Sequence, residues 1–139
     1  MTAQLIRADA LWDGVPYAYA STAPAGTLVF TAGACPLDAY GEVMAPGDVP
    51  AQARQAMANL AAALRAAGAG LDDVLQTRIY VASADQADLV AAWDVVRAAF
   101  GDHDAPGTLL GVTVLGWPGQ LFEIEAVAVA PAADSPAGA

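Results

Sequence analysis

The chain has 139 residues, 57% of them hydrophobic, and its 15 acidic and 5 basic side chains give a net charge of -10. This length fits one domain with a substantial core, and the negative charge argues against nucleic acid or an anionic membrane surface as partner. A single cysteine, Cys35, excludes an intramolecular disulfide and a cysteine-based metal cage.

The N-terminal third is typical of short strands separated by turns. Residues 4–12 predict an extended segment, which the turn at residues 14–16 ends. Residues 17–22 are expected to form a hairpin with residues 27–32, across the turn at 23–26. Residues 33–47, with three glycines, two prolines and Cys35, then form a loop at a strand end, where site residues are often found.

The middle of the chain predicts helix, strand, helix. Apolar residues recur at helical spacing between Pro50 and Ala67, with Asp48 as N-cap and Gly68 at the stop. Residues 75–81 predict a strand. Residues 85–100 predict a second helix, capped by Ser83 or Asp85, with a one-sided apolar stripe that we assign to the core. That stripe consists of Leu89, Trp93, Val96 and Phe100.

Two extended apolar runs between residues 109 and 129 are joined by a turn at residues 116–119. In the second run, Phe122 and Ile124 point to one face and Glu123 and Glu125 to the other, where two valines follow. A solvated face would not continue into valines, so we expect a partner chain or a cleft to cover it, most simply by self-association. Residues 131–139 are predicted to be a disordered tail, which leaves one domain at residues 1–130.

Several short segments along nearly the whole chain carry a joint signal in their order and spacing: residues 16–17, 28–33, 36–38, 59–60, 68, 72–74, 79–81, 108–112 and 123–126. Together they resemble the RidA/YjgF family, the reactive-intermediate deaminases formerly called endoribonuclease L-PSP. The resemblance implies a chorismate-mutase-like α+β fold, a six-stranded sheet with two helices on one face. It also implies a homotrimeric barrel with sites at the subunit interfaces.

The resemblance further implies cofactor-free hydrolysis of imine or enamine intermediates to carbonyl compounds and ammonia. In that scheme Glu123 activates water, Tyr17 lines the pocket, and Gly33 with its neighbours Ala34 and Cys35 contributes backbone amides. An arginine of the family motif would clamp the substrate carboxylate.

Gly107, followed by Thr108, occupies the place of that arginine in this sequence. Loss of such a clamp costs about 2 to 5 kcal/mol where the partner charge is left buried. Arg78, predicted on the same face as Glu123, is either a substitute clamp or an ion-pair partner of Glu123 or Glu125.

Cys35 could be a nucleophile if a base met it, or an inert thiol lining the pocket. His103, between two aspartates, is expected to be a solvated loop residue, and an aspartate–histidine metal site there has too few ligands. Trp117 could overhang the pocket or lie at the surface.

Two hypotheses for the function follow. The first is a cytoplasmic, homotrimeric hydrolase of small imines or enamines whose substrate depends little on a carboxylate clamp. The second is a ligand-binding or structural trimer in which the deaminase site has decayed. A nuclease role, suggested by the family's older name, is disfavoured by the negative charge.

Overall fold

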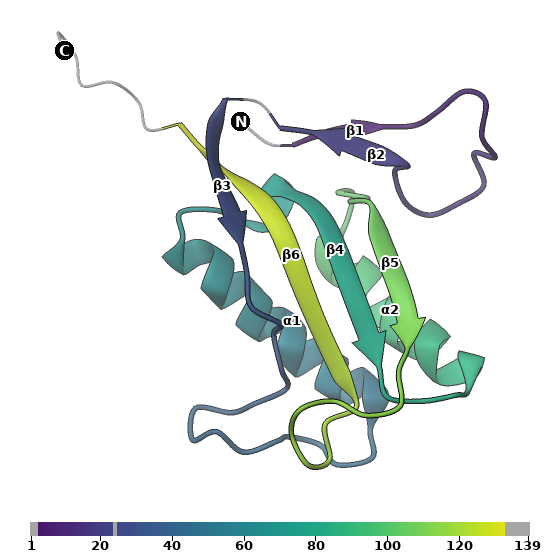
Figure 1. The fold of residues 1–139 in the computed structure, drawn as a ribbon, viewed down its shortest axis with the longest axis vertical. Helices are drawn as coiled ribbons and strands as arrows, with labels where there is room; N and C mark the ends of the chain where they lie inside the picture. The colour runs from purple at the N-terminus through teal and green to yellow at the C-terminus, as the bar shows by residue number, and fades with distance from the viewer. Residues whose placement is uncertain (1–2, 24, 133–139) are drawn as a thin grey trace, which may run out of the picture.

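The computed structural model describes residues 3–23 and 25–132, which form an α+β fold. Both helices cover one face of a four-stranded mixed sheet, and a separate two-stranded pair lies beyond one end of it (Figure 1). The expected fold class is confirmed, with the six strands divided into four and two. The strands are β1 (Gln4–Ile6), β2 (Ala20–Thr22), β3 (Gly26–Phe30), β4 (Val74–Val81), β5 (Gly107–Gly111) and β6 (Phe122–Pro131), and the helices are α1 (Val49–Ala66) and α2 (Gln86–Phe100).

The sheet has the order β3-β6-β4-β5, with β6 antiparallel to both of its neighbours and β4 parallel to β5. The parallel pair is joined through α2, as a parallel connection requires. The two strands of the C-terminal stretch are therefore not neighbours, because β4 lies between them (Figure 1).

The predicted hairpin between residues 17–22 and 27–32 is wrong. β2 pairs with β1, placing Ser21 opposite Leu5, whereas β3 pairs with β6, placing Leu28 opposite Val129. Alternation within a segment indicates a strand but does not choose its partner, and β6 offers β3 a long apolar edge. β6 also continues through Pro131, so residue 131 of the predicted tail belongs to a strand, and residues 133–139 of that tail lie outside the described residues.

Both helices begin at the predicted caps. The Asp48 side chain accepts a hydrogen bond from the Ala51 amide at 3.0 Å, and the Asp85 side chain accepts one from the Ala87 amide at 2.9 Å. α1 ends just before Gly68, whose φ of 81° suits glycine. These caps fix where each helix starts against the sheet.

The core lies between the helices and one face of the sheet. Leu60 and Leu64 of α1 are fully buried, as are Ile79 of β4 and Phe122 and Ile124 of β6. Burial of each such side chain stabilises the fold by about 1.5 to 3 kcal/mol. The period of two predicted for β4 and β6 is confirmed, because Ile79 and Ile124 face the helices while Arg78 and Glu125 face away.

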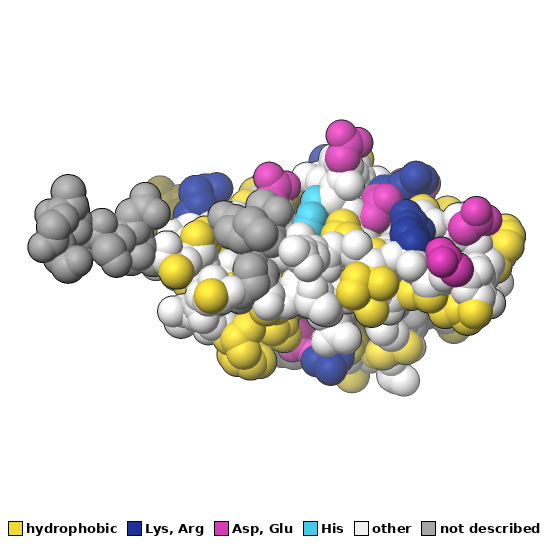
Figure 2. Space-filling model, turned by 90° about the horizontal axis from the view of Figure 1, so that it is seen from above, with side chains coloured by type: hydrophobic (Ala, Val, Ile, Leu, Met, Phe, Trp, Pro, Cys, Tyr) yellow, Lys and Arg dark blue, Asp and Glu magenta, His cyan; other side chains and the backbone are white. Residues whose placement is uncertain are grey.

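The other face of the sheet, which we call the open face, has no helix over it (Figure 1). Phe30 is 72% exposed, Leu28 52% and Leu110 44%, and all three lie on this face beside the half-buried Val127. Viewed from above, charged side chains gather along one edge of the molecule, and hydrophobic ones are prominent along the opposite edge (Figure 2). An exposed apolar sheet face of this kind marks an interaction surface.

Candidate functional site

Glu123 lies on the open face at the start of β6, and its carboxylate has two donors on one oxygen. The Cys35 thiol is 3.2 Å from Oε1, and the side-chain amide nitrogen of Gln120 is 3.3 Å from the same oxygen. The side chain is half-buried, and in the part of the chain that is described no donor meets its Oε2. The carboxylate is therefore held on one side and free on the other.

Gly33 lies directly against this carboxylate. A Cβ atom at position 33 would lie 2.5 Å from Cδ of Glu123 and 2.6 Å from its Oε2, closer than atoms can approach. The chain is held here because Ala34 and Ile124 exchange backbone hydrogen bonds of 2.6 and 3.2 Å. Only glycine at position 33 lets the carboxylate lie over the backbone.

The Cys35 thiol is a hydrogen-bond donor at this site. Burial, together with the hydrogen bond to the neighbouring Glu123 carboxylate, raises the pKa of the thiol to about 11. The thiol therefore stays protonated at neutral pH, where a nucleophile would need the thiolate. His103 does not serve as its base: it lies near Val74, which pairs with Ala128 at the far end of β6 from Glu123.

His103 itself is not the solvated loop residue that the sequence suggests. It is half-buried, and its Nε2 lies 2.8 Å from the Val74 carbonyl oxygen. Its ring also packs near Phe100, with the ring centres 6.3 Å apart. A hydrogen bond to the backbone explains why a histidine is accommodated at this depth.

A second group of predicted site residues surrounds a pocket of about 400 Å³ at the β5 edge of the sheet. Tyr17 and Trp93 stand edge to face there, with ring centres 6.3 Å apart. Arg7 fixes the Tyr17 segment, because its guanidinium donates to the carbonyl oxygens of Val15 and Tyr17 and pairs with Asp104. The pocket lining has no charged side chain and consists of Pro16, Tyr17, Trp93, Gly107, Thr108 and Leu109.

These two groups do not meet within one protomer. Gly107 pairs with Thr77 on β4, whereas Glu123 pairs with Tyr80, three residues further along that strand. Thr77 is buried on the helix side of the sheet, and Tyr80 points to the open face. Gly107 and Glu123 therefore face opposite sides of the sheet, and β4 lies between the strands that carry them.

Gly107 is restricted by its neighbour on β4. A Cβ atom there would lie 2.5 Å from Oγ1 of Thr77, a buried and β-branched side chain that moves little. We expect Gly107→Ala to lower the free energy of unfolding by about 1 to 3 kcal/mol, measured by urea denaturation. In a Thr77→Ala background most of this loss should disappear, since the oxygen is gone. Equal losses in both backgrounds would contradict the steric explanation.

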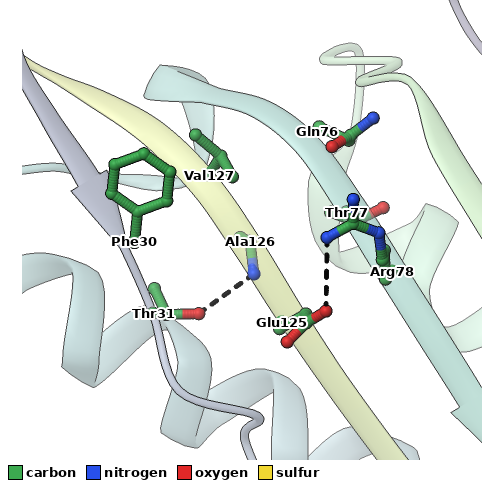
Figure 3. A pocket seen from close by; sticks show the side chains of 8 residues that line it. All are labelled: Phe30, Thr31, Gln76, Thr77, Arg78, Glu125, Ala126 and Val127. Atoms are coloured by element: carbon green, nitrogen blue, oxygen red, sulfur yellow. Dashed lines mark hydrogen bonds and ion pairs between the residues drawn. The ribbon is translucent and has the colours of Figure 1, made fainter.

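Arg78 lies on the open face and pairs with Glu125, with Nη1 of Arg78 3.5 Å from Oε1 of Glu125 (Figure 3). The Tyr80 hydroxyl donates to the same carboxylate at 2.8 Å, and this hydrogen bond raises the pKa of Tyr80. The guanidinium is 53% exposed, so the pair contributes little stability alone. It borders a hollow of about 80 Å³ lined by Phe30, Thr31, Gln76, Thr77, Arg78, Glu125, Ala126 and Val127.

The endoribonuclease L-PSP family profile matches residues 13–130. The chain belongs to this family, also called RidA/YjgF. A crystal structure of the Rid-family protein YyfB from Yersinia pestis has a TM-score of 0.86 and 33% identity to it, with 93% of this chain and 99% of that one covered.

Two further RidA-family relatives come from Escherichia coli. The 2-iminobutanoate/2-iminopropanoate deaminase of strain K12 is 36% identical over 107 residues, covering 75% of this chain and 80% of its own length. The crystal structure of TdcF with bound serine has a TM-score of 0.64 and 28% identity, with 91% of this chain and 93% of that one covered.

The sequence gives no clear indication of one residue that contacts Glu123 in this candidate site, Gln120. Its side chain is buried, and its oxygen accepts from the Trp117 amide at 3.1 Å while its nitrogen donates to the Phe122 carbonyl at 3.0 Å and to Glu123. The only signal was an amide residue three positions before the acid, inside a turn. The apolar stripe of α2 places Trp93 in the core, but the Trp93 ring also lines the Tyr17 pocket.

The described residues contain no set of side chains that could bind a metal ion. Residues 3–23 and 25–132 contain no group of three or more histidine, cysteine, aspartate or glutamate side chains placed to hold a metal ion. Within the same residues, neither helix has the length and apolar character needed to cross a bilayer.

Proposed function

We propose that the protein hydrolyses reactive imine or enamine intermediates to carbonyl compounds and ammonia. The observation that carries this proposal is the Glu123 carboxylate, bound at Oε1 and free at Oε2 over the Gly33 backbone. A carboxylate so placed can take a proton from water as the water oxygen bonds to the imine carbon. The proton then passes to the nitrogen, and the carbinolamine collapses to a carbonyl compound as the C–N bond breaks and ammonia leaves.

Relatives support this reaction class. The Escherichia coli relative at 36% identity is named for deamination of 2-iminobutanoate and 2-iminopropanoate. The solved TdcF holds serine, so a fold of this kind can accept a small metabolite. Site roles for Glu123, Tyr17 and Gly33 come from the family resemblance and the geometry together.

In this proposal the active site forms only when subunits of the protein associate. The Glu123 group on β6 and the Tyr17 pocket at the β5 edge are separated by β4 within one chain, and the open face presents Phe30 and Leu28 to a partner. In a homotrimer, the Glu123 group of one subunit would face the Tyr17 pocket of the next. Such a heterologous interface closes into a ring and buries the exposed apolar face.

The substrate we propose has an apolar group and needs no carboxylate clamp. The family resemblance places an arginine at position 107, and Gly107 supplies no charge there. The pocket beside it is lined by the Tyr17 and Trp93 rings and carries no charged side chain. Arg78 is already paired with Glu125, which makes it a poor substitute.

An imine-release assay tests this function. A flavin amine oxidase acting on benzylamine would supply an apolar imine, and an L-amino-acid oxidase acting on leucine would supply a 2-imino acid. Semicarbazide traps the free imine, so a deaminase lowers the yield of semicarbazone. We expect the protein to accelerate decay of the benzylamine-derived imine more than that of the 2-imino acid. Equal decay with and without folded protein, for both imines, would contradict the proposal.

A non-catalytic, ligand-binding trimer is the second candidate. The observation that favours it is the absence of any charged side chain around the pocket beside Gly107, since a decayed site would lose its substrate clamp. This function predicts that a small ligand quenches Trp93 fluorescence without being turned over.

A further inference from the structure

The two oxygens of the Glu123 carboxylate have different surroundings. Oε1 meets the Cys35 thiol at 3.2 Å and the Gln120 amide nitrogen at 3.3 Å, whereas Oε2 lies on the side of Gly33. A carboxylate can rotate about its last bond, which would exchange the two oxygens. Two donors that converge on one oxygen oppose this rotation, because both bonds would be lost.

We propose that Cys35 and Gln120 are positioning residues that hold Glu123 by Oε1 and leave Oε2 as the oxygen that takes the proton from water. This inference rests on the proposed function, since it assigns roles within the same site. It makes the thiol a part of the reaction geometry although it never touches the substrate.

Gln120 is rigid enough for this role. Its side chain is only 3% exposed, its oxygen accepts from the Trp117 amide, and its nitrogen also donates to the Phe122 carbonyl. Both hydrogens of the amide are thereby used, one on Phe122 and one on Glu123. The turn before β6 thus fixes the donor.

Cys35 is held from the other side by a different element. Its backbone carbonyl accepts a hydrogen bond from Asn59 of α1 at 2.8 Å, and the neighbouring Ala34 is bonded to Ile124 of β6. The thiol has a second acceptor, the Gly33 carbonyl, at the longer distance of 3.6 Å. The shorter contact to Glu123 is therefore the preferred one.

The charged and titratable groups around Glu123 do not prevent the Cys35 thiol from donating to its carboxylate. From the loop after β3 the carboxylate faces Cys35, from β4 it faces Tyr80, and along the open face lie Arg78 and Glu125, which pair with each other. Because the raised pKa of Cys35 keeps the thiol protonated through the neutral range, its donor role should not change with pH there.

Cys35→Ala and Cys35→Ser separate positioning from packing. Alanine removes the donor, and serine keeps one in nearly the same place. We expect Cys35→Ala to lower kcat about tenfold with little change in KM. Cys35→Ser should restore most of the lost kcat, and Gln120→Met should behave like Cys35→Ala.

A readout without turnover keeps this inference separate from the proposed function. The chain has one cysteine, so iodoacetamide labelling followed by mass spectrometry reports on Cys35 alone. In the native protein the labelling rate should rise toward a midpoint near pH 11, and Glu123→Gln should move that midpoint down toward the ordinary thiol range.

Each outcome decides between the two claims. An unchanged labelling midpoint in Glu123→Gln overturns the contact between the thiol and the carboxylate. An active protein whose Cys35→Ala variant keeps its kcat, or whose Cys35→Ser variant loses as much kcat as Cys35→Ala, overturns the positioning role alone. A shifted midpoint in a protein that turns over no imine leaves the contact standing and overturns both the proposed function and the catalytic role of the contact.

Discussion

Glu123→Gln should lower kcat/KM for imine hydrolysis by roughly 10² to 10⁴-fold, the usual contribution of a general base. Glutamine has the same shape, and its oxygen can still accept from Cys35 and Gln120. Because glutamine has as many heavy atoms as glutamate, the side chain at position 123 can still pack against the backbone of Gly33. The loss should therefore appear in turnover, measured by the semicarbazide assay, with the melting temperature nearly unchanged.

Glu125→Gln is the matched control for this substitution. Glu125 lies two residues further along the same strand and face, but its partners are Arg78 and Tyr80. Removing its charge breaks a half-exposed ion pair and should change kcat/KM by less than about fivefold. If Glu125→Gln lost as much activity as Glu123→Gln, Glu123 would not be the only candidate for the general base. The Glu125 carboxylate, paired with Arg78, would then have to be considered as the base.

The helices and the alternation of the strands could be predicted because their causes are local. The Asp48 and Asp85 caps, the stop before Gly68 and the two faces of β6 each depend on residues within a few positions of one another. Strand partners depend on distant parts of the chain. β2 pairs with β1 rather than with the next strand, a choice that alternation alone cannot indicate.

The candidate site divides in the same way. Glu123, Gly33 and Tyr17 were identified through the family resemblance, and the contact of Glu123 with Gly33 and Cys35 joins segments 88 or more residues apart. Gln120 belongs to no sequence motif, so the sequence does not indicate its contact with Glu123. The contact depends on the turn before β6, which directs the Gln120 side chain toward the Glu123 carboxylate. Gly107 and Glu123 lie on opposite faces because their partners on β4, Thr77 and Tyr80, are an odd number of residues apart, a register that depends on distant parts of the chain.

Phe30→Glu should convert the proposed trimer into monomers. The Phe30 ring is 72% exposed in a single chain, so a polar side chain there should cost the monomer little. In an assembly that covers the open face, the variant would lose the burial of an aromatic ring and would bury a charge without a partner. Together these effects should weaken association by roughly 10² to 10³-fold at each interface, which size-exclusion chromatography with light scattering would detect.

Val90→Glu is the control for this change, because Val90 is also an exposed apolar residue, at 56%, but lies on α2 away from the open face. Both variants add the same charge, so a difference between them reports on location. The Phe30→Glu monomer keeps the Glu123, Cys35 and Gln120 contacts, which lie within one chain. It should nevertheless lose imine hydrolysis, since the only Tyr17 pocket left would be the one at the β5 edge of the same chain, which β4 separates from Glu123. A fully active monomer would show that Glu123 works without a neighbouring subunit, and the shared site would have to be abandoned.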